Sequence, residues 1–188
     1  MKRLLLVPLI FVGAPVFAQA TTARSAAPPA TNPGVTSARM LWSDITGFVT
    51  RAAEQIPEAD YAFKPTPQVR TLGELIGHIA GAQNMICAAA LNEPQKSEDD
   101  IEKNVKTKAG LVAALKASTE YCGRAYAQSD AASAGSTKLF GQDRSRMYAL
   151  MINATHNGEH YGNMVTYMRI KGMVPPSSQQ GPPPPPAK

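Results

Sequence analysis

The sequence predicts an all-α protein, a four-helix bundle. Four segments carry apolar residues at the helical period, and prolines, glycines and polar runs separate them. No segment of any length alternates between apolar and polar residues as a strand does, and no internal repeat is present. Four amphipathic helices around one core are the simplest architecture for this pattern.

The N-terminal stretch, residues 1–20, has the composition of a secretory signal peptide. It begins with Lys2 and Arg3, continues as a short apolar run, and closes on small residues that place the cleavage after Ala18 or Ala20. We therefore expect a periplasmic or secreted protein with no membrane anchor after signal cleavage.

The segments on either side of the predicted bundle are poor in large apolar residues. Residues 21–35 are predicted to be a disordered linker, and residues 177–188 a Pro-rich disordered tail. The bundle is thus expected to span residues 36–176, which is long enough to bury one core.

The net charge is too small to indicate a nucleic-acid partner. The formal charge of +5 includes Lys2 and Arg3, so their removal with the signal leaves +3. No basic run is interleaved with aromatic residues. A small-molecule substrate is the expected partner, and the sequence leaves open whether the chain forms a homodimer.

The first helix is predicted to begin at Thr36 or Ser37 and to end at Ile56, before Pro57. Pro65 and Pro67 predict an extended connection after it. Its apolar stripe contains Leu41, Ile45, Phe48, Val49, Ala52 and Ile56.

The second helix is predicted over residues 71–92. Thr71 and Glu74 have the spacing of a capping box, in which each side chain binds the other residue's backbone amide. His78 lies at the edge of the apolar arc of this helix, where a lone histidine is more often a boundary residue than a ligand.

A charged connection, residues 92–106, precedes the third helix, predicted over residues 107–128. We expect one short helical turn after Ser97. At about 3.3 Å per residue the connection can return along a helix of about 30 Å, so the second and third helices can run parallel.

Cys87 and Cys122 are the only cysteines. In parallel helices they would lie at nearly the same height and could form a disulfide, whereas in antiparallel helices they would be too far apart. An exported protein meets an oxidising environment, which permits the pair. Two buried, unpaired thiols are the alternative, and the sequence leaves both open.

The fourth helix is predicted from Gln142 or Asp143 to Lys171, after a linker of small residues, and Gly172 is placed to end it. A projection at about 100° per residue separates two stripes on this helix. The predicted core stripe contains Met147, Leu150, Met151, Ala154, Gly158, Tyr161, Val165 and Met168. The second stripe, predicted to face away from the core, contains Asn153, His156, His160, Asn163 and Tyr167.

His156 and His160 are two of the three histidines in the chain, and they are four residues apart on one helix face. Imidazoles at this spacing bind divalent metals. With Glu159 they also match the H-x-x-E-H pattern of inverted zincins. That protease needs a further ligand downstream, and residues 161–188 contain no Asp, Glu or His. Any third ligand must therefore lie upstream, where His78 is the remaining histidine.

Two stretches together resemble the DinB-like (DinB/YfiT) superfamily: residues 61–80, which contain His78, and residues 156–178, which begin with His156-Asn-Gly-Glu-His160. The resemblance covers about residues 38–178. It implies an up-down-down-up four-helix bundle in which His78, His156 and His160 bind a divalent metal ion. Zinc or nickel is the first expectation, with iron or manganese as alternatives.

The resemblance implies three functions to compare. A metal-dependent hydrolase acting on a small molecule is the first interpretation, because three ligands leave positions for water and substrate. A non-catalytic metal- or small-molecule-binding module is the second. A thiol-dependent S-transferase, as in some relatives, is the third, although export would separate it from cytosolic thiols. Candidate catalytic residues are Glu159 and Tyr167, and candidate substrate-binding residues are Asn153, Asn163 and Tyr167.

Overall fold

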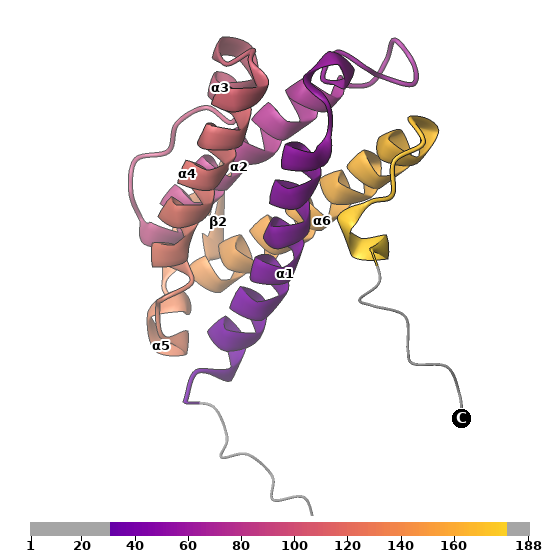
Figure 1. The fold of residues 1–188 in the computed structure, drawn as a ribbon. Helices are drawn as coiled ribbons and strands as arrows, with labels where there is room; N and C mark the ends of the chain where they lie inside the picture. The colour runs from indigo at the N-terminus through magenta and orange to yellow at the C-terminus, as the bar shows by residue number, and fades with distance from the viewer. Residues whose placement is uncertain (1–30, 180–188) are drawn as a thin grey trace, which may run out of the picture.

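The structure, a computed structural model, describes residues 31–179. The predicted signal peptide and most of the predicted linker and tail lie outside these residues. Four long helices form the bundle, as predicted (Figure 1). They are α1 (Pro33–Gln55), α2 (Leu72–Leu91), α4 (Lys108–Ala125) and α6 (Arg146–Ile170). No helix among the described residues is both long enough and apolar enough to span a membrane.

The helix ends follow local sequence signals. Thr71 and Glu74 form the predicted capping box: the Glu74 N–H donates to Thr71 Oγ1 over 3.2 Å, and the Thr71 N–H donates to the Glu74 carboxylate over 2.8 Å. Gly172, which follows α6, has a φ of 73°, the left-handed conformation that ends a helix.

The start of α1 differs from the prediction, because the helix begins at Pro33, inside the expected linker. Proline is favourable in a first helical turn. The carboxylate of Asp130 accepts the N–H groups of Gly34 and Val35, at 3.0 and 2.7 Å. A distant side chain therefore caps this helix, and the sequence gives no local sign of it.

The tail also differs near its start. Residues Pro176–Ser178 form the short 3-10 helix η2, and the Tyr161 hydroxyl both accepts the Ser177 N–H and donates to its Oγ. Residues 176–178 thus have a defined structure that packs on α6.

The order of helix directions is up-down-down-up. The parallel arrangement of α2 and α4 places Cys87 and Cys122 side by side, with Cα atoms 5.3 Å apart, and they form a disulfide. α6 runs parallel to α1, since a β-carbon at Gly34 near the start of α1 would meet Met147 at the start of α6, and Phe48 further along α1 stacks on Tyr161 further along α6. It runs antiparallel to α2, since Asn153 lies near Cys87 late in α2, whereas His156, which follows Asn153, lies near His78 early in α2. The structure therefore resolves the cysteine question in favour of pairing.

Two short helices occupy the connections. The expected turn after Ser97 is α3 (Asp99–Asn104), and the small-residue linker contains α5 (Asp130–Ser133). α3 lies directly on α2 at Gly77 and Gly81: a β-carbon at Gly77 would come 2.8 Å from Glu102 Cα, and one at Gly81 would overlap the Glu98 carbonyl. These glycines allow the two backbones to approach closely.

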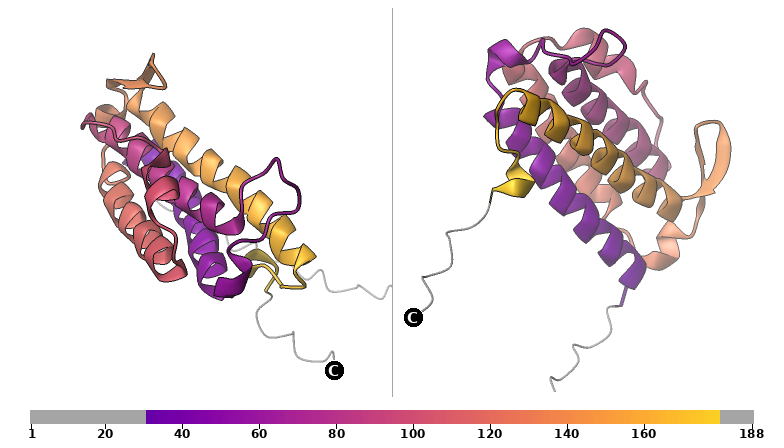
Figure 2. Two further views of the ribbon diagram at one scale, coloured as in Figure 1. Left: turned by 90° about the horizontal axis from the view of Figure 1, so that it is seen from above. Right: turned by 90° about the vertical axis from the view of Figure 1, so that its right-hand side faces the viewer.

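Although the sequence shows no strand-like alternation, the structure contains two short strands beside its helices. β1 (Ser136–Leu139) and β2 (Gln142–Ser145) form an antiparallel hairpin that stands out at one end of the bundle (Figure 2). Phe140 and Gly141, with φ of 50° and 73°, form its two-residue turn. Four-residue strands with Leu139 as their only large apolar residue are too short to show alternation in the sequence.

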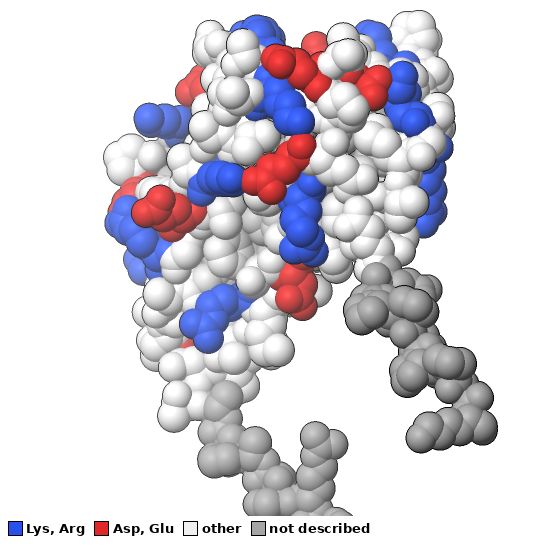
Figure 3. Space-filling view, viewed as in Figure 1, with Lys and Arg blue, Asp and Glu red and all other residues white. Residues whose placement is uncertain are grey.

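The core contains a polar network as well as apolar side chains. Trp42 stacks on Tyr126, and its Nε1 donates to Gln83 Oε1 over 2.9 Å. Asn157 Nδ2 donates to the same oxygen over 3.1 Å. On the surface, lysine and arginine side chains alternate with aspartate and glutamate over the face shown in Figure 3. One such pair, Lys116 with Glu54 at 2.6 Å, joins α4 to α1.

Candidate metal centre

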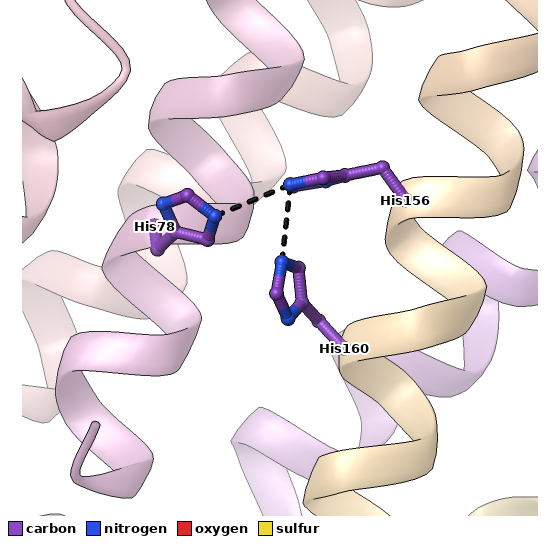
Figure 4. Close-up of side chains that lie close together, drawn as sticks. All are labelled: His78, His156 and His160. Atoms are coloured by element: carbon purple, nitrogen blue, oxygen red, sulfur yellow. Dashed lines mark hydrogen bonds between the residues drawn. The ribbon is translucent and has the colours of Figure 1, made fainter. Parts of the chain in front are cut away.

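Three histidines from two helices converge inside the bundle. His78 extends from α2, and His156 and His160 extend from α6, so that their rings point toward one another (Figure 4). The Nε2 atom of His156 lies 3.2 Å from Nε2 of His78 and 3.0 Å from Nε2 of His160. The two stretches that the sequence singled out are therefore brought together at one point.

The spacing of these nitrogens fits a metal ion. Zinc–imidazole bonds of about 2.0–2.1 Å in a tetrahedral arrangement place ligand nitrogens about 3.3–3.4 Å apart. The observed separations of 3.0 and 3.2 Å are close to that value. Three Nε2 atoms that face one another can share few hydrogen bonds, because a neutral imidazole offers one N–H. A divalent cation between them would satisfy all three lone pairs.

The prediction that the histidine stripe of α6 faces away from the core is wrong. His160 is 8% exposed and Asn153 is fully buried, whereas Met151, assigned to the core stripe, is 57% exposed. α6 packs against α1 on one side and α2 on the other, and the wide face it buries includes the polar side chains of Asn153 and Asn157. Apolar residues alone therefore do not mark this face.

A carboxylate lies behind His78. Glu102 Oε2 on α3 is 3.6 Å from His78 Nδ1, which has no closer hydrogen-bond partner. Arg70 holds this carboxylate, with its Nε 3.0 and 3.1 Å from the two oxygens. Metal-binding histidines commonly donate their other N–H to a carboxylate, which fixes the ring orientation. Neither residue is predicted from the sequence, because only the packing of α3 on α2 brings Glu102 to His78.

The other two rings have different surroundings. Asn163 Nδ2 lies 3.4 Å from His160 Nδ1, and exchange of the amide oxygen and nitrogen would let Oδ1 accept an N–H from that ring. His156 Nδ1 is buried with no partner among the described residues. Within residues 31–179, His78 is thus the one candidate ligand whose Nδ1 faces a charged side chain.

Burial keeps the three imidazoles neutral. Removal from water is the main cause that lowers the pKa of His78, His156 and His160 to about 4, and the nearby Arg70 guanidinium lowers the pKa of each ring further. At neutral pH each ring therefore has a free lone pair, which is the form that binds metal.

A cavity of about 720 Å³ opens beside the histidines and is lined by His160. Three of the predicted site residues, Glu159, Asn163 and Tyr167, also line it. Asn153 does not: it lies beside the disulfide, with its Nδ2 3.2 Å from the Tyr126 hydroxyl. The Asn153 amide therefore contacts groups in the core and does not line the cavity.

The fold and the site define a class of protein: an up-down-down-up helical bundle with a candidate three-histidine metal centre between its second and last long helices. The family model described as the DinB superfamily matches residues 48–164. The chain belongs to the DinB superfamily.

Solved structures share the fold. A DinB-like protein from Bacillus cereus is 17% identical with a TM-score of 0.66, covering 75% of this chain and 95% of its own. A DinB-like protein from Bacillus subtilis is 20% identical with a TM-score of 0.59, covering 76% and 99%. A mycothiol-dependent maleylpyruvate isomerase is 14% identical with a TM-score of 0.56, covering 70% and 59%. No curated protein matches the chain in sequence.

Proposed function

We propose that the protein is an exported metal-dependent hydrolase that acts on a small molecule. The observation that carries this proposal is that Nε2 of His156 lies 3.2 Å from Nε2 of His78 and 3.0 Å from Nε2 of His160, and that His160 lines a cavity of about 720 Å³. Three protein ligands are typical of catalytic rather than structural zinc sites. Imidazole ligands favour zinc or nickel, with iron or manganese as the other candidates.

The residues of this chain have distinct roles in the proposal. His78, His156 and His160 would hold the ion, and Glu102 would orient His78. A divalent ion in this site supplies Lewis acidity and lowers the pKa of a bound water. Hydrolysis of an amide breaks the C–N bond, adds the water oxygen to the acyl carbon and transfers a proton to the leaving nitrogen.

Few of the side chains that line the cavity could deliver a proton to the leaving nitrogen. Glu102 already binds Arg70, and Tyr167 donates its hydroxyl to the Arg70 backbone carbonyl over 3.2 Å. Glu159 lines the cavity, is exposed and makes no hydrogen bond or ion pair within residues 31–179. Glu159 is therefore our candidate for moving a proton between the cavity and solvent.

Two features support export. Residues 1–20 have the pattern of a signal peptide, and Cys87 and Cys122 form a fully buried disulfide of the kind that persists in oxidising compartments. Mass spectrometry of the protein recovered from the periplasm or medium should give a chain that starts at Gln19 or Thr21. An uncleaved chain retained in the cytosol would refute export.

The activity test compares metal-loaded and metal-stripped protein on panels of esters, amides and thiol conjugates. The proposal expects turnover that requires metal and is lost in His156→Ala, while the surface variant Arg39→Gln keeps it. Inactivity across the panels with a filled site would favour a binding module. Turnover only with an added low-molecular-weight thiol would favour a transferase.

A further inference from the structure

The cavity beside the histidines contains one cationic side chain, that of Arg70. Arg70 precedes the capping residue Thr71 of α2, and it lines the cavity together with His160. Its side chain is 39% exposed. A ligand that entered this cavity would thus meet the Arg70 guanidinium together with His160, the histidine of the cluster that lines the cavity.

Arg70 is held on two sides. Its Nε donates to both carboxylate oxygens of Glu102, at 3.0 and 3.1 Å, and its backbone carbonyl accepts the Tyr167 hydroxyl at 3.2 Å. Within residues 31–179, Nε is the only side-chain nitrogen of Arg70 that donates a hydrogen bond. The Nη1 and Nη2 groups of an already positioned side chain therefore remain as donors.

The carboxylates around the cavity are mostly engaged. Glu102 faces Arg70 and His78, and Glu74 accepts the Thr71 N–H in the capping box. Glu159 is exposed on α6 and unpaired among the described residues. The uncommitted groups are thus a guanidinium fork and one acid, an arrangement that suits one anionic group on the ligand better than several.

A guanidinium fork matches the two oxygens of a carboxylate and forms charge-assisted hydrogen bonds with them. We infer that the cavity takes a small molecule with one carboxylate, which Arg70 binds through its Nη atoms while the bond to be hydrolysed lies at the three histidines. This inference rests on the proposed function and names its substrate class, which is carboxylate-bearing amides or esters such as N-acyl amino acids.

Binding of a matched pair of probes to the full chain loaded with Co²⁺ tests this inference. The probes are the monohydroxamate of succinic acid and its neutral analogue, in which an amide replaces the carboxylate. Changes in the Co²⁺ absorption spectrum report binding without any turnover. The carboxylate probe should bind about tenfold more tightly than the neutral probe, which corresponds to one partly exposed charge-assisted contact.

Three variants test whether Arg70 causes the preference for the carboxylate probe. In Arg70→Gln the preference should fall to about twofold or less. Both probes are compared on the same Co²⁺-loaded variant, so any effect of releasing Glu102, which Arg70 holds, acts on both probes and leaves their ratio as the readout. Arg70→Lys should retain part of the preference because it keeps the charge. Arg39→Gln, which removes an exposed charge on α1, should retain all of it.

The outcomes separate this inference from the proposed function. Equal affinity for the two probes in the wild type, or an unchanged preference in Arg70→Gln, would overturn the carboxylate assignment and leave the hydrolase proposal standing. If neither probe changes the Co²⁺ spectrum of the wild type, the metal has no accessible position, and both proposals fail.

Discussion

Glu102 Oε2 lies 3.6 Å from Nδ1 of His78, while Nε2 of the same ring faces the other two histidines. The ring is thus placed between a carboxylate on α3 and the candidate metal position between α2 and α6. Because the His78 side chain is 7% exposed and that of Glu102 19%, water competes little for this contact.

Loss of the Glu102 carboxylate should weaken metal binding. We expect Glu102→Ala to lower the affinity for Zn²⁺ by about 10–100-fold, as is usual when the partner of a metal-bound histidine is removed. Competition with a chromophoric chelator measures this affinity. Asp100→Asn, an exposed acid on the same short helix, is the control and should bind as the wild type does.

Removal of each ligand should show whether the site contains three histidines. His78→Ala and His160→Ala are expected to lose metal to a similar degree, since each removes one of three nitrogens from the cluster. Elemental analysis after dialysis gives the metal content per chain. Full occupancy in His78→Ala would show that α2 supplies no ligand.

Because α3 lies so close to α2, even a small substitution between them should lower the stability of the protein. Gly81→Ala should destabilise the protein by about 1–3 kcal/mol, because the added methyl overlaps the Glu98 backbone and must push α3 away. It should also weaken metal binding, since α3 carries Glu102. Gly123→Ala is the matched control: its added methyl would meet no atom within 4 Å, so it should stabilise α4 by about 0.5–1 kcal/mol. Urea unfolding measures both changes.

The histidines should make metal-free protein sensitive to mild acid. Burial lowers the folded-state pKa of His78, His156 and His160 to about 4, below the ordinary value of 6.5. Between these values the unfolded chain binds more protons than the folded one, so stability is complete above about pH 6.5 and falls as the pH drops toward 4. Thermal unfolding in the presence of a chelator should show this slope. It should be smaller in His156→Ala, and an equal slope in that variant would contradict the assignment.

The disulfide should contribute measurably to stability. It closes a loop with a sequence separation of 35 residues, so Cys87→Ala combined with Cys122→Ala should lose about 2–4 kcal/mol. Urea unfolding of the double variant gives the loss. Independently, thiol titration of the denatured, unreduced wild type should find almost no free thiols; two thiols per chain would show that the cysteines are unpaired.

The sequence was sufficient for the main features of the fold and for the three histidines of the candidate metal centre. The capping box at Thr71, the stop at Gly172 and the short turn after Ser97 each depend on nearby residues, which a sequence displays directly. The family pattern joined His78 to His156 and His160, and the structure places all three together.

What the sequence could not predict depends on contacts between distant segments. Glu102 reaches His78 only because Gly77 and Gly81 let α3 lie on α2. Apolar residues do not mark the buried face of α6, because Asn153 and Asn157 are core residues with polar side chains. The hairpin was missed because strands of four residues give too short a pattern.

The cap that Asp130 provides for α1 has a consequence for the order in which the chain can assemble. Gly34 and Val35 leave the ribosome well before Asp130, which follows them by 96 and 95 residues. Until then the first turn of α1 lacks its partner, and closing so large a loop is slow relative to local helix formation. Within residues 31–179, the cap of α1 can therefore form only after α2 and α4 have been synthesised, since both precede Asp130 in the chain.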